Sequence, residues 1–201
     1  MKLNFYIAIA VMGLVSLASC KSSEIAQQSK TNTTLAIPSP KTVTLDKNFQ
    51  IATGQTTYVP VYSHIYHDNK KAIFNLAVTL SIRNTDLTNP IIITSIRYYD
   101  SNGKLVKQYL KQPIQLDALA STDFFVDRDD KSGGLGANFI VEWVAQTEIS
   151  EPIVQAVMIG TDFQQGISWI SPGKVIKSQK REQGAGSRGV SQPAIKSLVD
   201  S

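Results

Sequence analysis

The segment from Phe74 to Arg83 alternates strictly, with Phe, Leu, Val, Leu and Ile at every second position and small or polar residues between them. A period of two places one row of side chains on a core and the other row toward water, which is typical of a half-buried β-strand. Segments rich in Val, Ile, Phe and Tyr predict further strands at 58–62, 91–99, 104–110, 122–126, 138–145, 153–160 and 166–170.

Turn residues separate these strands, and none of the connections reads as a helix. Asn102 and Gly103 favour a tight hairpin between the segments 91–99 and 104–110. Short strands without helical crossovers predict an all-β chain with a single antiparallel β-sandwich of immunoglobulin-like topology, and a small β-barrel is the alternative.

Composition divides the chain into four parts. Residues 1–19 resemble a lipoprotein signal peptide, 20–45 a flexible polar tether, 46–171 the β-sandwich domain, and 172–201 a basic disordered tail. Residues 41–171 carry 11 Lys/Arg against 13 Asp/Glu, whereas 172–201 carry 6 against 2. The domain therefore has no basic excess with which to hold phosphates, which argues against nucleic acid as a partner.

Cys20 is the only cysteine, and it closes the run Leu17-Ala18-Ser19-Cys20 after an apolar stretch that begins at Leu3. The pattern resembles a bacterial lipoprotein signal, which implies cleavage before Cys20 and lipid on its sulfur. An ordinary secretory signal and an uncleaved anchor helix are the alternatives. The resemblance predicts a lipid-anchored protein of the cell envelope, facing the periplasm or the surface, and Lys21 favours the outer membrane. No second cysteine remains for a disulfide or a thiolate site.

Five stretches of the domain together resemble one family. They are 58–66 (YVPVYSHIY), 80–86 (LSIRNTD), 96–100 (IRYYD), 134–143 (GLGANFIVEW) and 157–161 (VMIGT). The combination is similar to the bacterial "domain of unknown function 3124" family of small exported proteins, over residues 58 to about 176. The resemblance implies one domain, and it brings no reaction, cofactor or partner with it.

Both histidines lie in one short segment, as His64 and His67, with Asp68 beside them. Imidazole and carboxylate groups are ligands for zinc, copper or nickel, so these three residues form a candidate metal site. In a regular strand His64 and His67 would point to opposite faces, and they could share an ion only if the chain turns there. The alternative is that they are ordinary structural or surface residues.

A second cluster combines carboxylates with glycines, at Asp127, Asp129, Asp130, Gly133 and Gly134. Oxygen ligands on a flexible loop suit a hard cation such as calcium, although the spacing fits no EF-hand loop. A solvated turn is the alternative. Carboxylates near Asp127, drawn also from Asp123 and Glu142, would serve an envelope hydrolase.

Aromatic residues offer a third candidate site, a surface for glycan or peptide formed by Tyr62, Tyr66, Tyr99 and Trp169. Alternation predicts that Trp143 lies in the core and Glu142 outside it. Since no catalytic set stands out, the sequence favours a non-enzymatic binding module that contacts the membrane through its lipid and an envelope protein or glycan through the domain. A metal-binding protein and an envelope hydrolase are the alternatives.

Overall fold

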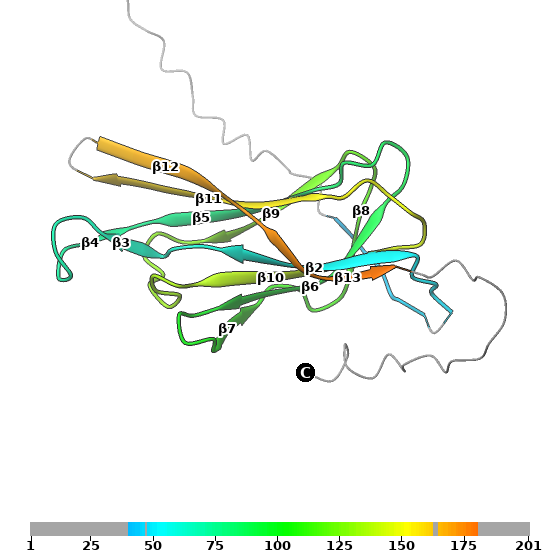
Figure 1. The fold of residues 1–201 in the computed structure, drawn as a ribbon, viewed down its shortest axis with the longest axis horizontal. Coiled ribbons are helices and arrows are strands. Elements are labelled where there is room, and N and C mark those ends of the chain that lie inside the picture. The colour runs from blue at the N-terminus through cyan, green and yellow to red at the C-terminus, as the bar shows by residue number, and fades with distance from the viewer. Residues whose placement is uncertain (1–39, 47, 163–164, 181–201) are drawn as a thin grey trace, which may run out of the picture. The chain divides into compact units, whose positions relative to one another are not determined.

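The computed structural model describes residues 40–46, 48–162 and 165–180, which form strands and turns (Figure 1). This part of the chain contains no helix long and apolar enough to cross a membrane. The predicted signal peptide with Cys20, the tether up to residue 39 and the tail from residue 181 lie outside the described residues.

The described residues form thirteen strands. In chain order they are β1 (Lys41–Thr42), β2 (Thr53–Pro60), β3 (His64–Tyr66), β4 (Ile73–Asn75), β5 (Ala77–Arg83), β6 (Ile91–Tyr99), β7 (Leu105–Gln108), β8 (Ile114–Leu116), β9 (Ser121–Val126), β10 (Asn138–Ala145), β11 (Ile153–Asp162), β12 (Gln165–Pro172) and β13 (Lys174–Lys180).

Two antiparallel sheets make up the domain, with a separate β3–β4 hairpin beside them. The seven-stranded sheet has the order β1-β8-β6-β10-β2-β13, and β7 also pairs with β6. The four-stranded sheet has the order β12-β11-β5-β9. Figure 1 shows the two sheets as layers, which confirms the predicted antiparallel sandwich.

The core lies between the two sheets and is built from alternate residues of their strands. In β5 the predicted row Val78, Leu80 and Ile82 is fully buried, and in β10 Phe139, Val141 and Trp143 belong to the same cluster. Burial of each such side chain stabilises the fold by about 1.5–3 kcal/mol. The position of Trp143 in the core was predicted correctly.

The chain passes from one sheet to the other at Gly173, the only residue between β12 and β13 (Figure 1). Its N–H donates to the carbonyl of Val154 at 2.8 Å, and a Cβ at this position would stand 2.6 Å from Cγ2 of Thr57. Glycine is required here because two backbones approach closely.

The crossing at Gly173 corrects the predicted start of the tail at residue 172. Residues 174–180 form β13, which pairs with β2 and therefore belongs to the sheet. Likewise β1 pairs with β8 inside the segment 20–45 that was predicted as a tether. Both predictions were wrong at these residues because short or lysine-rich strands lack apolar alternation, although the backbone can still complete a ladder.

The predicted strand at 74–83 is interrupted at Leu76. There the N–H of Leu76 donates to the carbonyl of Ser63 at 3.0 Å, and the chain changes from the β3–β4 hairpin to the four-stranded sheet. The strand predicted at 58–62 begins earlier, at Thr53, and ends at Pro60. Proline has no N–H to donate, so it suits the end of a strand.

A loop glycine packs against the buried ring of Tyr98. A Cβ on Gly133 would lie 1.8 Å from the Tyr98 hydroxyl oxygen and 2.7 Å from Cβ of Ala137. We expect Gly133→Ala to lower the free energy of unfolding by about 1–3 kcal/mol, because a fully packed core must shift. Urea unfolding of the full chain measures this effect.

Gly136→Ala in the same loop is the matched control. A Cβ there would make only ordinary contacts, at 3.4 Å or more, with Ser101. Equal stability of both variants and the unmodified chain would contradict the proposed packing of Gly133 on Tyr98.

Candidate functional site

Ser63 directly precedes β3, which begins at His64, and hydrogen bonds join Ser63 to a distant glycine. Ser63 is 0 % exposed, and its hydroxyl lies 3.2 Å from Nδ1 of His64 and accepts the N–H of Gly134 at 2.9 Å. The N–H of Ser63 donates to the carbonyl of Gly134 at 3.1 Å. Gly134 has φ +78°, a conformation that favours glycine. The hydrogen bonds of Ser63 thus join its segment to the loop at Gly134, and burial makes its hydroxyl inaccessible to a substrate.

The predicted metal ligands are distributed along the β3–β4 hairpin. His64 pairs with Asn75 in the ladder, whereas exposed His67 follows β3 and donates its backbone N–H to the carbonyl of Ala72. Asp68 accepts a hydrogen bond from Asn69 at 3.1 Å. Among the described residues no group of three or more His, Cys, Asp or Glu side chains is placed to hold a metal ion.

The carboxylates of the aspartate-rich loop bond to their own turns. Asp127 accepts the N–H of Asp129 at 2.9 Å, and Asp130 accepts the N–H of Ser132 at 2.9 Å. The carbonyl of Gly133 accepts the N–H and the hydroxyl of Ser101, at 2.9 and 3.0 Å. The carboxylates of the loop are therefore engaged in local turns, and its glycine end is held by Ser101, which corresponds to the turn alternative of the sequence interpretation.

The carboxylates proposed for a hydrolase belong to different sheets. Asp123 lies on β9, where it pairs with Ser81 of the four-stranded sheet, and Glu142 lies on β10 of the seven-stranded sheet. Their neighbours Thr122 and Val141 are buried, so the two acidic side chains point to opposite outer faces of the sandwich. This arrangement does not place Asp123 and Glu142 on either side of one substrate bond.

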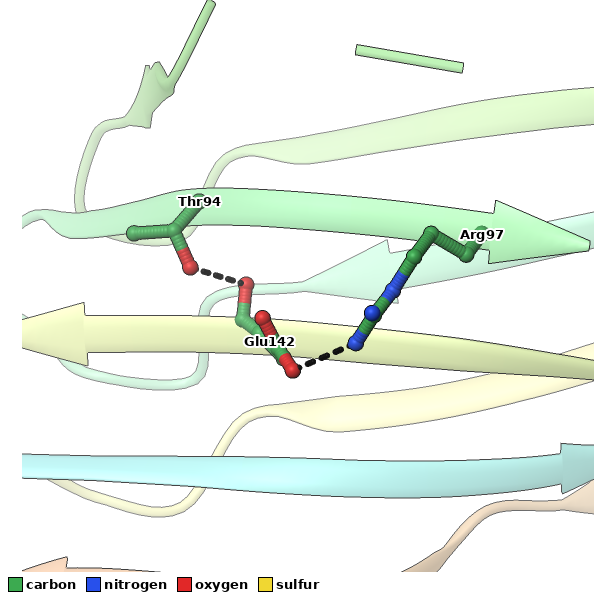
Figure 2. A network of polar contacts seen from close by, with 3 residues as sticks. All are labelled: Thr94, Arg97 and Glu142. Atoms are coloured by element: carbon green, nitrogen blue, oxygen red, sulfur yellow. Dashed lines mark hydrogen bonds and ion pairs between the residues drawn. The ribbon is translucent and has the colours of Figure 1, made fainter. Parts of the chain in front are cut away.

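Glu142 instead forms an ion pair that the sequence did not predict. Nη2 of Arg97 lies 2.6 Å from Oε1 of Glu142, and the two side chains are 25 % and 15 % exposed. Figure 2 shows this pair on neighbouring strands, with the hydroxyl of Thr94 donating to the Glu142 carbonyl at 3.2 Å. Glu142 lies outside the core as predicted, and Arg97 on the neighbouring strand balances its charge.

Asp86 is the most heavily hydrogen-bonded carboxylate of the described residues. One oxygen accepts the N–H groups of Thr88 and Asn89, at 3.0 and 2.8 Å, and the other accepts the N–H of Ser150 at 3.1 Å. These backbone hydrogen bonds lower the pKa of Asp86 far below its ordinary value. Because Asn84 donates to three backbone carbonyls nearby, this network holds together one end of the sandwich.

Tyr98 is buried, Tyr109 is partly buried, and both favour the protonated form. Burial, together with the nearby Asp130 carboxylate, raises the pKa of Tyr98 well above its ordinary value and that of Tyr109 to about 12. The Tyr109 hydroxyl donates to the carbonyl of Phe125 at 3.1 Å. Neither hydroxyl is suited to act as a base near neutral pH.

The four predicted surface aromatics do not all share one face. Tyr62 and Trp169 pack edge to face, with ring centroids 6.2 Å apart. Tyr66 is exposed on the β3–β4 hairpin, and half-buried Tyr99 lies on β6 in the seven-stranded sheet. Tyr99 points away from the core because Tyr98, the adjacent residue, points into it.

The outer side of the four-stranded sheet carries large apolar side chains, a feature that sequence reasoning missed. The register aligns Phe125, Thr79, Val157 and Ile170 in one row across four strands, and Ile159 lies in the next row. Phe125, Ile159 and Ile170 are 52, 50 and 59 % exposed. We call Phe125, Val157, Ile159 and Ile170 the apolar face. In antiparallel sandwiches the outer rows are usually polar.

Acidification tests the Asp86 network. A carboxylate whose folded pKa lies below its unfolded pKa, about 3.9, stabilises the fold above that value, and the contribution is lost as pH falls through the folded pKa. We therefore expect Asp86→Asn to lower the melting temperature at pH 7 and the difference from the unmodified chain to shrink below about pH 4. Calorimetry between pH 2 and 7 measures it.

Asp68→Asn changes an exposed carboxylate outside this network and is the control. A difference for Asp86→Asn that stayed constant down to pH 2 would contradict the assigned role of its charge.

A comparison with solved structures matches the crystal structure of Thermotoga maritima 1070, with 12 % identity and a TM-score of 0.38, over 60 % of this chain and 92 % of that one. A TM-score this low supports no conclusion about fold or function. No curated protein matches the chain. Among protein families, the one described as "Protein of unknown function (DUF3124)" matches residues 54–176. Since this match covers more than half of the chain, the protein belongs to the DUF3124 family.

Proposed function

We propose that this protein is a non-enzymatic binding module of the bacterial cell envelope, anchored by lipid on Cys20, with the apolar face as its contact surface. The observation that carries the proposal is the exposure of Phe125, Ile159 and Ile170 on one side of one sheet. Grouped apolar side chains on the outside of a stable domain are typical of surfaces that contact another molecule.

The polar clusters support a binding role over a catalytic one because their groups are already engaged. Ser63 is buried in a loop contact, and Asp86 is held by backbone N–H groups. Arg97 and Glu142 neutralise each other. A general base or nucleophile must instead reach the reacting atom of a substrate.

The chemistry of the apolar face favours a protein partner over a glycan. Three of its four members are aliphatic, at positions 157, 159 and 170. Glycans are bound through hydrogen-bonding groups placed beside aromatic rings, whereas the central part of a protein interface is apolar and depleted of charge. The partner is therefore an envelope protein that presents its own apolar side chains.

Charged substitutions on the apolar face test this function. We expect Phe125→Lys and Ile159→Lys each to lower recovery of the partner about tenfold or more in cross-linking pull-downs from intact envelope, because binding would bury an unpaired charge. Leu105→Lys is the matched control, since Leu105 is a similarly exposed apolar residue on β7, in the other sheet. Equal loss in all three variants, or no loss in any, would contradict the assigned surface.

The anchor has its own test. We expect Cys20→Ser to move the protein from the membrane fraction to the soluble fraction, because acyl chains contribute about 0.8 kcal/mol per buried methylene to membrane binding. Ser19→Ala, which keeps a small residue before the cysteine, should stay with the membrane. Unchanged membrane association of Cys20→Ser would exclude lipid at this residue.

A further inference from the structure

Strand β12 has a free edge that lacks the usual protection until Pro172 at its end. It pairs with β11 on one side, and no described strand pairs with its other side. Its sequence, QGISWISP, contains no charged residue, and all but two of its residues are exposed. An exposed edge of this kind is a template for another strand, and natural sheets normally block such edges with lysine, proline, bulges or shortness.

The other sheet edges of the described domain carry such protection. Strand β13 has Lys174, Lys177 and Lys180 and a register shift between Val175 and Lys177. Strand β1 has two residues, β3 and β4 have three each, and β7 has four, including Lys107. On β9 the carbonyl of Phe125 already accepts a hydrogen bond from the Tyr109 hydroxyl, and Asp123 adds a charge. The unprotected edge of β12 is therefore an exception within this domain.

The phase of the ladder shows which groups of β12 face the open edge. Gly173 donates its N–H to the carbonyl of Val154, so the backbone N–H and C=O groups of Val154 point from β11 toward β12. The register between β11 and β12 is unbroken, and backbone direction alternates along antiparallel strands. It follows that Gly166, Ser168 and Ile170 turn their N–H and C=O groups away from β11.

We propose that a second copy of this chain pairs with β12 along this edge, antiparallel and about a two-fold axis at Ser168. In this register Ser168 opposes Ser168 of the second copy, and Gly166 opposes Ile170. All the outward N–H and C=O groups of these three residues then find partners. A shift that brings Pro172 into the pairing would lose a donor, because proline has no N–H.

Side chains and charge favour a second copy as the occupant. Ile170 would cover a glycine, so that it meets no clash, and exposed Ile167 would lie against Trp169 of the second copy. The strand is uncharged, so two copies do not repel each other. Pairing stops at two chains because the opposite edge of the sheet, β9, is protected.

The dimer goes beyond the proposed function and does not depend on it. Edge pairing leaves the outer side of the sheet open and joins two copies of the apolar face into one surface across eight strands. Phe125→Lys lies on β9, at the opposite edge of the sheet, and should leave the dimer intact, whereas Ile159 pairs with Ser168 in the ladder and does not separate the two effects. Loss of partner binding and loss of dimerisation are thus separate outcomes.

Disulfide trapping tests the two-fold register. In the full chain with Cys20→Ser, we expect Ser168→Cys to form a disulfide-linked dimer on mild oxidation, since opposed residues of a ladder lie about 5.5 Å apart between Cα atoms, within disulfide range. Ser121→Cys on β9 and Ser178→Cys on β13 are matched controls on the protected edges and should remain monomeric. Equal cross-linking at all three positions would overturn the proposal.

Sedimentation equilibrium provides the second measurement, again on the full chain with Cys20→Ser. We expect a dimer, and we expect Ser168→Lys, which gives the edge the protection found on β13, to raise the dissociation constant at least tenfold. Ser121→Lys is the control and should change nothing. A chain that stays monomeric up to about 1 mM, or a dimer that Ser168→Lys leaves unchanged, would overturn the proposal.

Discussion

The burial of one row of side chains from each sheet holds this domain together. The chain has one cysteine, at position 20 and outside the domain, so no disulfide supports the sandwich. The row Val78, Leu80 and Ile82 is fully buried, and the strict alternation of β5 then forces Thr79 outward. Through the register, the same alternation places Phe125, Val157 and Ile170 on the outer side. The core thus determines which side chains form the apolar face.

Long strands with clear alternation could be predicted from the sequence. Ile91–Tyr99 and Asn138–Ala145 have the bounds that their patterns predict, because each carries alternating buried residues along most of its length. Strand β8 was not predicted because three residues are too few to establish a period. Strand β13 was not predicted because its lysines, which suit a solvent-exposed edge, give the segment the composition of a polar tail.

The candidate sites were harder to predict, because polar side chains find partners far away in sequence. Arg97 and Glu142 are 45 residues apart, and Asp86 bonds to a backbone N–H 64 residues away. Recognising either contact requires the order and register of the strands, which hydrophobic patterns do not give. The clusters at His64–Asp68 and Asp127–Gly134 were easy to find because their residues lie close together in the sequence. The structure uses much of their hydrogen bonding in local turns and loop contacts.

The apolar face and the β12 edge meet at Ile170, which contributes its side chain to the first and its backbone to the second. Side-chain labelling by hydroxyl radicals, in intact envelope and in the purified chain, tests the role of the face most directly. We expect Phe125, which the β12 pairing leaves open, to be protected in the envelope and labelled when purified. Exposed Leu87 should be labelled equally in both. Equal labelling of Phe125 in the two preparations would contradict a contact role for this surface.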